Sequence, residues 1–137
     1  MNEENSEQVT NLEVPDHLLY SQDHVWVDTS SSPAVMGVTE YAEEQLGDLV
    51  FLDLPEVGTR VQAGDEVVEL ESSKAVEPLV TPVSGTITYV NRDASDDPGV
   101  INSDPYGEGW IMKLELEDEE PELMTAKEYG ALIARLS

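Results

Sequence analysis

The sequence contains no cysteine and no long apolar run. Without cysteine, the chain can form no disulfide, offers no thiol nucleophile and has no thiolate ligand for a metal. No stretch approaches the ~20 apolar residues that a membrane-spanning helix needs. Residues 1–5 are acidic and polar, unlike the basic and apolar regions of a secretory signal. These absences predict a cytoplasmic protein without a membrane partner.

Basic residues are also scarce. Six lysines and arginines stand against thirty aspartates and glutamates, so the formal charge is −24 at pH 7. This charge repels nucleic acids and anionic lipid surfaces, and neither is expected as a partner. Two compatible interpretations of the acidity remain open. It suits a solvated surface in a salt-tolerant or halophilic cell, and it also suits an acidic face that docks on basic enzymes.

The length of 137 residues fits one domain with one hydrophobic core. Residues 1–13 are acidic without apolar periodicity and predict a flexible N-terminal tail, which leaves 14–137 as a single domain. Short β runs separated by glycine and proline predict a mainly β fold, a flattened β-barrel or sandwich. The expected strands are 24–28, 34–38, 50–54, 67–71, 79–83, 86–90 and 110–116.

Two helices are expected beside the strands. Thr39 is a suitable N-cap for a short internal helix over 40–46, and Gly47 stands where a C-cap glycine belongs. A C-terminal helix is expected over 126–136, capped by Thr125. Its predicted apolar face consists of Tyr129, Leu132, Ile133 and Leu136.

Lys74 is the candidate functional residue. It is one of only three lysines, and it lies between two β runs at the expected apex of a hairpin. A lone lysine in a turn is most often a solvated surface residue. Its neighbours change that interpretation, because Glu71, Ser72, Ser73 and Ala75 precede the return strand and the segment Pro82-Val83-Ser84-Gly85.

This pattern is similar to the attachment site of lipoyl domains, and more closely resembles the H-protein family of the glycine cleavage system. The resemblance covers about residues 18 to 133, and its many motifs occur in one order. Besides the lysine segment, they are His24-Val25-Trp26-Val27, Gly37-Val38-Thr39-Glu40-Tyr41-Ala42, Leu46-Gly47-Asp48-Leu49-Val50-Phe51, Leu54-Pro55-Glu56-Val57-Gly58, Gly64-Asp65, the run from Val100 to Trp110, and Ala126-Lys127-Glu128-Tyr129.

The resemblance implies a lipoyl-type fold and lipoic acid in amide linkage to Lys74. Glu71, Ser72, Ser73 and Ala75 would then be recognised by the lipoylating enzyme, and the small residues leave room for it. Biotin carriers use a similar hairpin, but there the lysine is usually flanked by methionines. Ser73 and Ala75 therefore favour lipoyl over biotinyl.

The resemblance also implies a shuttle without turnover of its own. The arm would accept an aminomethyl group from glycine decarboxylase (P protein) and present it to aminomethyltransferase (T protein). Dihydrolipoyl dehydrogenase (L protein) would reoxidise the arm, and a lipoate ligase or lipoyltransferase would attach it. A carrier that visits several enzymes is expected to be a monomer.

No catalytic or metal site is expected from the residues. His17 and His24 are the only histidines, and no nucleophile pattern surrounds them. For His24, a structural role beside Trp26 is favoured over a chemical one. The acidic segment 93–97 lacks the ligand spacing of an EF-hand and is expected to be a loop, as is 117–122.

Two positions depart from the family pattern. Val25 stands where the family usually has glutamate, and Pro78 stands where an acid usually follows the lysine by four positions. Asp23 and Glu77 are adjacent and are candidates to replace those acids in holding a cationic amine.

The departures leave two other functions open. One is an H-like lipoyl carrier of another pathway, which would donate lipoyl groups or carry sulfur intermediates. The other is an acidic binding module without lipoate. An acyltransferase component is not expected, because no catalytic domain follows the lipoyl-like region.

Overall fold

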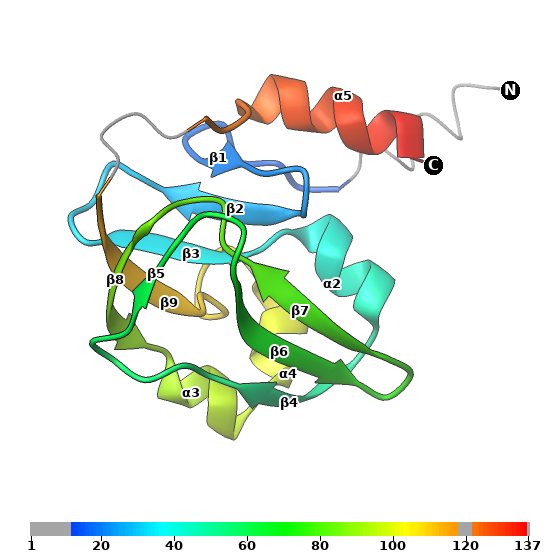
Figure 1. Cartoon of the computed structure of the whole chain (residues 1–137). Coiled ribbons are helices and arrows are strands. Elements are labelled where there is room, and N and C mark those ends of the chain that lie inside the picture. Colours follow the sequence, from blue (N-terminus) through cyan, green and yellow to red (C-terminus); the bar gives the residue numbers. More distant parts are fainter. Residues whose placement is uncertain (1–11, 118–121, 137) are drawn as a thin grey trace, which may run out of the picture.

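The computed structural model describes residues 12–117 and 122–136 (Figure 1). Most of the predicted tail and the middle of the predicted loop 117–122 lie outside these residues. The elements are β1 (Leu19–Tyr20), β2 (Val25–Asp28), β3 (Ala34–Val38), α2 (Glu40–Leu46), β4 (Leu49–Asp53), β5 (Arg60–Val61), β6 (Glu66–Ser72), β7 (Val76–Val80), β8 (Gly85–Val90), α3 (Arg92–Asp96), α4 (Gly99–Ser103), β9 (Met112–Leu116) and α5 (Ala126–Leu136).

Within the described residues, the strands form two antiparallel sheets. The larger has the order β1-β2-β3-β9-β8-β5, and the smaller has the order β4-β6-β7. The main core is built from the apolar side chains of both sheets, together with Ala94 of α3 and Ile101 of α4. The two sheets thus form a flattened sandwich that is not closed into a barrel. This confirms the predicted mainly β fold.

A second apolar cluster holds the C-terminal helix against the larger sheet. Tyr129 and Ile133 of α5 pack with Leu18, Tyr20 and Trp26. Figure 1 shows α5 lying across β1, away from the smaller sheet. Of the predicted apolar face, Tyr129 and Ile133 are buried and Leu132 is half-buried. Leu136 is 51% exposed, because it occupies the final position of the helix, beyond the buried part of that face.

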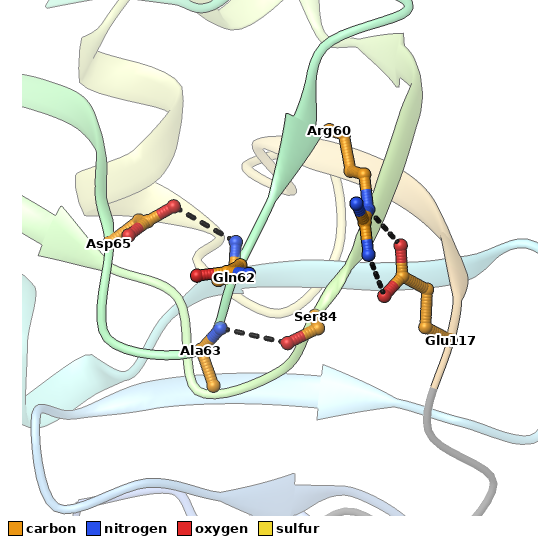
Figure 2. Close-up of polar contacts among 6 residues, drawn as sticks. All are labelled: Arg60, Gln62, Ala63, Asp65, Ser84 and Glu117. Carbon is orange, nitrogen blue, oxygen red and sulfur yellow. Dashed lines mark hydrogen bonds and ion pairs between the residues drawn. The ribbon is translucent and has the colours of Figure 1, made fainter.

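The crossing from β5 to β6 is held by polar contacts around a tight loop (Figure 2). The backbone amide of Gln62 donates to the Asp65 carboxylate at 2.9 Å, and the backbone amide of Ala63 donates to the Ser84 hydroxyl at 3.0 Å. Arg60 makes a two-pronged ion pair with Glu117, at 2.5 and 3.1 Å. The first contact closes the loop, the second joins it to the turn before β8, and the ion pair joins β5 to the end of β9.

The predicted helices are present with their predicted caps. The Thr39 hydroxyl accepts from the Ala42 amide, and the Gly47 amide donates to the Glu43 carbonyl. The Thr125 hydroxyl accepts from the Glu128 amide at the start of α5.

Some local expectations were wrong. The acidic segment 93–97 is not a loop, because most of it forms helix α3. Asn91 caps that helix, and its buried Ala94 packs into the core. No sequence pattern indicated α4, β1 or β5. No helix in the described parts of the chain is long and apolar enough to cross a membrane.

Candidate functional site

Lys74 lies in the turn of the β6–β7 hairpin. The last strand pair before the turn joins Glu71 to Val76. The turn is closed by the Ser72 amide, which donates to the Ala75 carbonyl at 2.8 Å. The Ser72 hydroxyl accepts from the amides of Lys74 and Ala75 at 3.2 and 3.0 Å. A serine hydroxyl is suited to this bracing because it can accept from nearby backbone amides.

The residues predicted around Lys74 differ in accessibility. Lys74, Glu71 and Ser73 are exposed and Ala75 is half-buried, so a modifying enzyme could reach them. Ser72 is only 6% exposed, and its hydroxyl is used inside the turn. Its position suits a role in shaping the turn more than a direct contact with an enzyme.

The side chain of Lys74 lies against the turn between α2 and β4. A Cβ atom placed on Gly47 would be 3.1 Å from Lys74 Cε, which is tighter than ordinary contact. Gly47 also has φ +82°, in the left-handed region that favours glycine. Next to it, the Asp48 carbonyl accepts from the Ser73 amide at 3.1 Å. The hairpin tip is therefore joined to this turn by a backbone hydrogen bond, and the Lys74 side chain packs against Gly47. The sequence predicted the C-cap glycine but not its contact with Lys74.

Asn102 of α4 supports the same turn from the other side. Its Nδ2 donates to the Gly47 carbonyl at 2.8 Å and to Glu43 Oε1 at 3.1 Å. Its Oδ1 accepts from the Leu49 amide at 2.9 Å. Glu43 is buried, and burial raises the pKa of its carboxyl although the bond from Asn102 lowers it. This role of Asn102 was not predicted, because nothing local to residue 102 indicates a contact more than fifty residues away.

A cleft of about 320 Å³ opens beside the hairpin. Figure 1 shows α2 next to β7, and both elements contribute walls. The apolar lining comes from Val25, Val38, Ala42, Leu46, Leu70, Ala75, Pro78 and Leu79, and the polar lining from Asp23, His24, Tyr41, Gln45 and Glu77. The hairpin wall thus begins at Ala75, one residue after Lys74. Val25 and Pro78, which stand where the family usually has acids, line this cleft together with Asp23 and Glu77, the candidates to replace those acids.

His24 lies on the cleft wall in an unusual backbone conformation. Its φ is +67°, and the strand that was predicted to begin there begins instead at Val25. The ring lies 4.6 Å from the ring of Tyr41, and Nδ1 is 2.8 Å from the Tyr129 hydroxyl. Burial lowers the pKa of His24, although the nearby Asp23 opposes the shift.

The expected contact of His24 with Trp26 is not among the ring contacts of the described residues. Trp26 instead lies 6.1 Å from the ring of Tyr106 and donates from Nε1 to the Pro105 carbonyl at 3.0 Å. The positive φ of His24 takes its side chain out of the alternation along β2.

Comparisons with known proteins agree on one family. The glycine cleavage H-protein family model matches residues 18–135. A glycine cleavage system H protein of Bifidobacterium longum is 64% identical over 128 residues, which cover 93% of each chain. One from Rubrobacter xylanophilus is 46% identical over 118 residues, which cover 86% of this chain and 93% of that one.

A solved structure shows the same arrangement. The crystal structure of a glycine cleavage system H protein from Mycobacterium marinum matches with a TM-score of 0.81 and 43% identity, over 87% of this chain and 98% of that one. The family match therefore extends over both sheets, the Lys74 hairpin and nearly all of α5. The chain belongs to the glycine cleavage H-protein family.

Proposed function

We propose that this chain is the lipoyl carrier of a glycine cleavage system, with lipoic acid in amide linkage to Lys74. It moves an aminomethyl group from glycine decarboxylase to aminomethyltransferase, and it catalyses no step itself. The observation that carries this proposal is an exposed lysine at the tip of a hairpin whose return strand forms one wall of a cleft. Family membership supports the choice of cofactor.

The residues around Lys74 fit a lipoyl group. The amide removes the positive charge of the lysine, so the arm can lie against apolar walls at little desolvation cost. The cleft of about 320 Å³ is at the lower end of the usual range for small-molecule sites and combines eight apolar lining residues with five polar ones. When bound, the group supplies a dithiolane that can be reduced and can carry the cargo.

The protein positions the arm and shelters the end of it. Ser72 fixes the turn, and Gly47 leaves space for the lysine methylenes. Leu70 and Leu79 help to exclude water from the cleft. The carboxylates of Asp23 and Glu77 are exposed residues that line the same cleft, and their negative charges would attract a cationic amine.

The partners follow from the same role. Glycine decarboxylase, aminomethyltransferase and dihydrolipoyl dehydrogenase would each act on the arm, and a lipoate ligase or lipoyltransferase would attach it. We propose that residues 14–137 act as one carrier domain and that the carrier works as a monomer. Exposed carboxylates such as Glu69 and Glu71 on the hairpin are available to basic partner surfaces.

The first test is mass spectrometry of the intact chain after incubation with lipoate, ATP and an active lipoate ligase. A mass increase of one lipoyl amide is expected in the wild type and in Lys127→Arg, and none in Lys74→Arg. Lys127 is a suitable control because it is also exposed. If the wild type gains no mass, or if Lys74→Arg gains it, the proposed site is wrong and the acidic binding module becomes the better account.

A second test addresses the cargo, because Val25 and Pro78 leave another lipoyl pathway open. Lipoylated chain is incubated with glycine decarboxylase and glycine, and the bound aminomethyl group is followed with time. Glu77→Gln and Asp23→Asn are expected to lose it faster than the wild type, while Glu69→Gln, on the same hairpin but outside the cleft lining, is not. If the wild type accepts no aminomethyl group at all, a carrier for another pathway is favoured.

A further inference from the structure

A chain of buried hydroxyls connects helix α5 to the cleft. The Tyr129 hydroxyl lies 2.8 Å from His24 Nδ1 and 2.7 Å from Thr39 Oγ1. Tyr129 and Thr39 are fully buried. Each hydroxyl proton therefore needs an acceptor within the protein, because a buried donor without one is destabilising. Of these three hydrogen-bonded residues, His24 is the one that lines the cleft.

The direction of the bonds follows from counting donors and acceptors. Thr39 Oγ1 already accepts from the Ala42 amide at 3.2 Å. Its own proton needs an acceptor, and the Tyr129 oxygen is the neighbour that can take it. The Tyr129 proton is then directed to His24 Nδ1. The reverse direction would leave the Thr39 proton without an acceptor among residues 12–117 and 122–136.

We propose that Tyr129 is a positioning residue that fixes His24 as the neutral tautomer with its proton on Nε2. The cleft wall then carries a fixed N–H donor at His24 instead of a cation. Protonating the ring would require a proton on Nδ1, where the Tyr129 hydroxyl donates. Burial raises the pKa of Tyr129, so this hydroxyl keeps its proton at neutral pH.

The consequence for the cargo rests on the proposed function. The charged and titratable groups around His24 are Asp23 on its own turn, Tyr41 on α2, Glu77 on β7 and Tyr129 on α5. A cationic amine held near Asp23 and Glu77 would be repelled by an imidazolium beside it. By holding His24 neutral, Tyr129 keeps the negative character of the cleft.

The test is nitrogen NMR of the histidines in the full unmodified chain. The sequence has only two, and exposed His17 serves as an internal reference. Tyr129→Phe removes the hydroxyl and keeps the ring that stacks on Tyr20 at 4.7 Å. Tyr41→Phe is the matched control, since it removes a hydroxyl from the other ring that contacts His24.

In the wild type and in Tyr41→Phe, His24 is expected to show an unprotonated Nδ1 and a protonated Nε2 throughout the neutral range. In Tyr129→Phe, the tautomers mix and the His24 titration midpoint rises by about one pH unit, the size of one lost hydrogen bond. A protonated Nδ1 in the wild type would overturn the proposal, and this spectrum decides even if the variant does not fold. Equal spectra of wild type and Tyr129→Phe would also overturn it.

The functional half is tested with lipoylated chains loaded by the decarboxylase. Tyr129→Phe is expected to lose the aminomethyl group faster than the wild type near pH ~6, and equally fast near pH ~8, where the imidazole is neutral in both. Equal loss at both pH values would contradict this role. Failure of the lipoyl function itself would prevent loading but leave the NMR result intact, so the two failures are distinguishable.

Discussion

Replacing Asn102 by alanine tests how firmly α4 holds the turn on which Lys74 lies. The substitution removes the bonds to the Gly47 carbonyl, the Leu49 amide and Glu43. The first two flank Asp48, whose carbonyl accepts from the Ser73 amide at the hairpin tip. The hairpin tip should therefore loosen although no residue of the hairpin has been changed.

The magnitude follows from the three bonds. Each contributes a net ~0.5–1.5 kcal/mol, and Asn102 is half-buried, so water replaces part of what is lost. We expect the free energy of unfolding to fall by about 2–3 kcal/mol. The buried carboxyl of Glu43 also loses the donor that opposes its desolvation, so its pKa should rise further.

Asn91 provides a matched control. Its side chain also makes three hydrogen bonds, donating to the carbonyls of Glu108 and Trp110 and accepting from the Ala94 amide. These bonds hold α3 to the segment before β9, and none of them reaches the hairpin. Asn91 is buried, so Asn91→Ala should lose at least as much stability as Asn102→Ala, without loosening the Lys74 turn.

The assay combines urea unfolding with amide hydrogen exchange at Ser73 and the rate of lipoylation of Lys74. Both alanine variants should unfold at lower urea concentrations than the wild type. Only Asn102→Ala should show faster exchange at Ser73 and a changed lipoylation rate under native conditions. If both variants change these two readouts equally, or neither does, Asn102 acts only through global stability and our reasoning about the turn is refuted.

Two further predictions concern stability alone. Gly85→Ala should destabilise the fold by ~1–3 kcal/mol in urea unfolding, because the added Cβ would be 2.2 Å from the Glu115 carbonyl oxygen. The Cβ of Gly130→Ala in α5 meets no atom within 4 Å, so this variant should be more stable than the wild type by ~0.5–1 kcal/mol. Similar effects of the two substitutions would contradict the close backbone approach at Gly85. Burial raises the pKa of Glu43 above its ordinary value of 4.5, so the folded state binds this proton more tightly than the unfolded state, and the stability it contributes is lost as pH rises through the folded pKa. The stability of Glu43→Gln relative to the wild type should therefore increase from about pH 4.5 towards neutrality, and a pH-independent difference in urea unfolding would argue against a raised pKa.

The sequence predicted best those features whose causes are local. Thr39 and Gly47 were recognised as caps because a hydroxyl before a short helical segment and a glycine after it have clear physical roles. The position of Lys74 in a hairpin turn followed from two β runs and the small residues between them, although the return strand β7 is Val76–Val80 and not 79–83 as predicted. The two-residue strands β1 and β5 were missed, since such short segments carry no periodicity to detect.

The features that sequence could not predict depend on distant partners. The cleft exists because α2, β7 and the turn before β2 meet in space. His24 was expected beside Trp26, but its positive φ and the Tyr129 hydroxyl, more than one hundred residues later, determine its surroundings. Asn102 likewise acts on a turn that only the fold brings near it.

Pro78 has a consequence for how other proteins can approach the hairpin. It lies on β7, which is the outer strand of the sheet β4-β6-β7, opposite Glu69 of β6. Proline has no amide hydrogen to donate and is tolerated on an outer strand where that position faces solvent. Pro78 therefore interrupts the row of backbone donors along the edge of β7. This disfavours pairing of β7 with a strand of another protein or with β7 of a second copy. The enzymes proposed to act on Lys74 would therefore approach from the tip or across the outer face of the hairpin, and they could dissociate without breaking strand pairing.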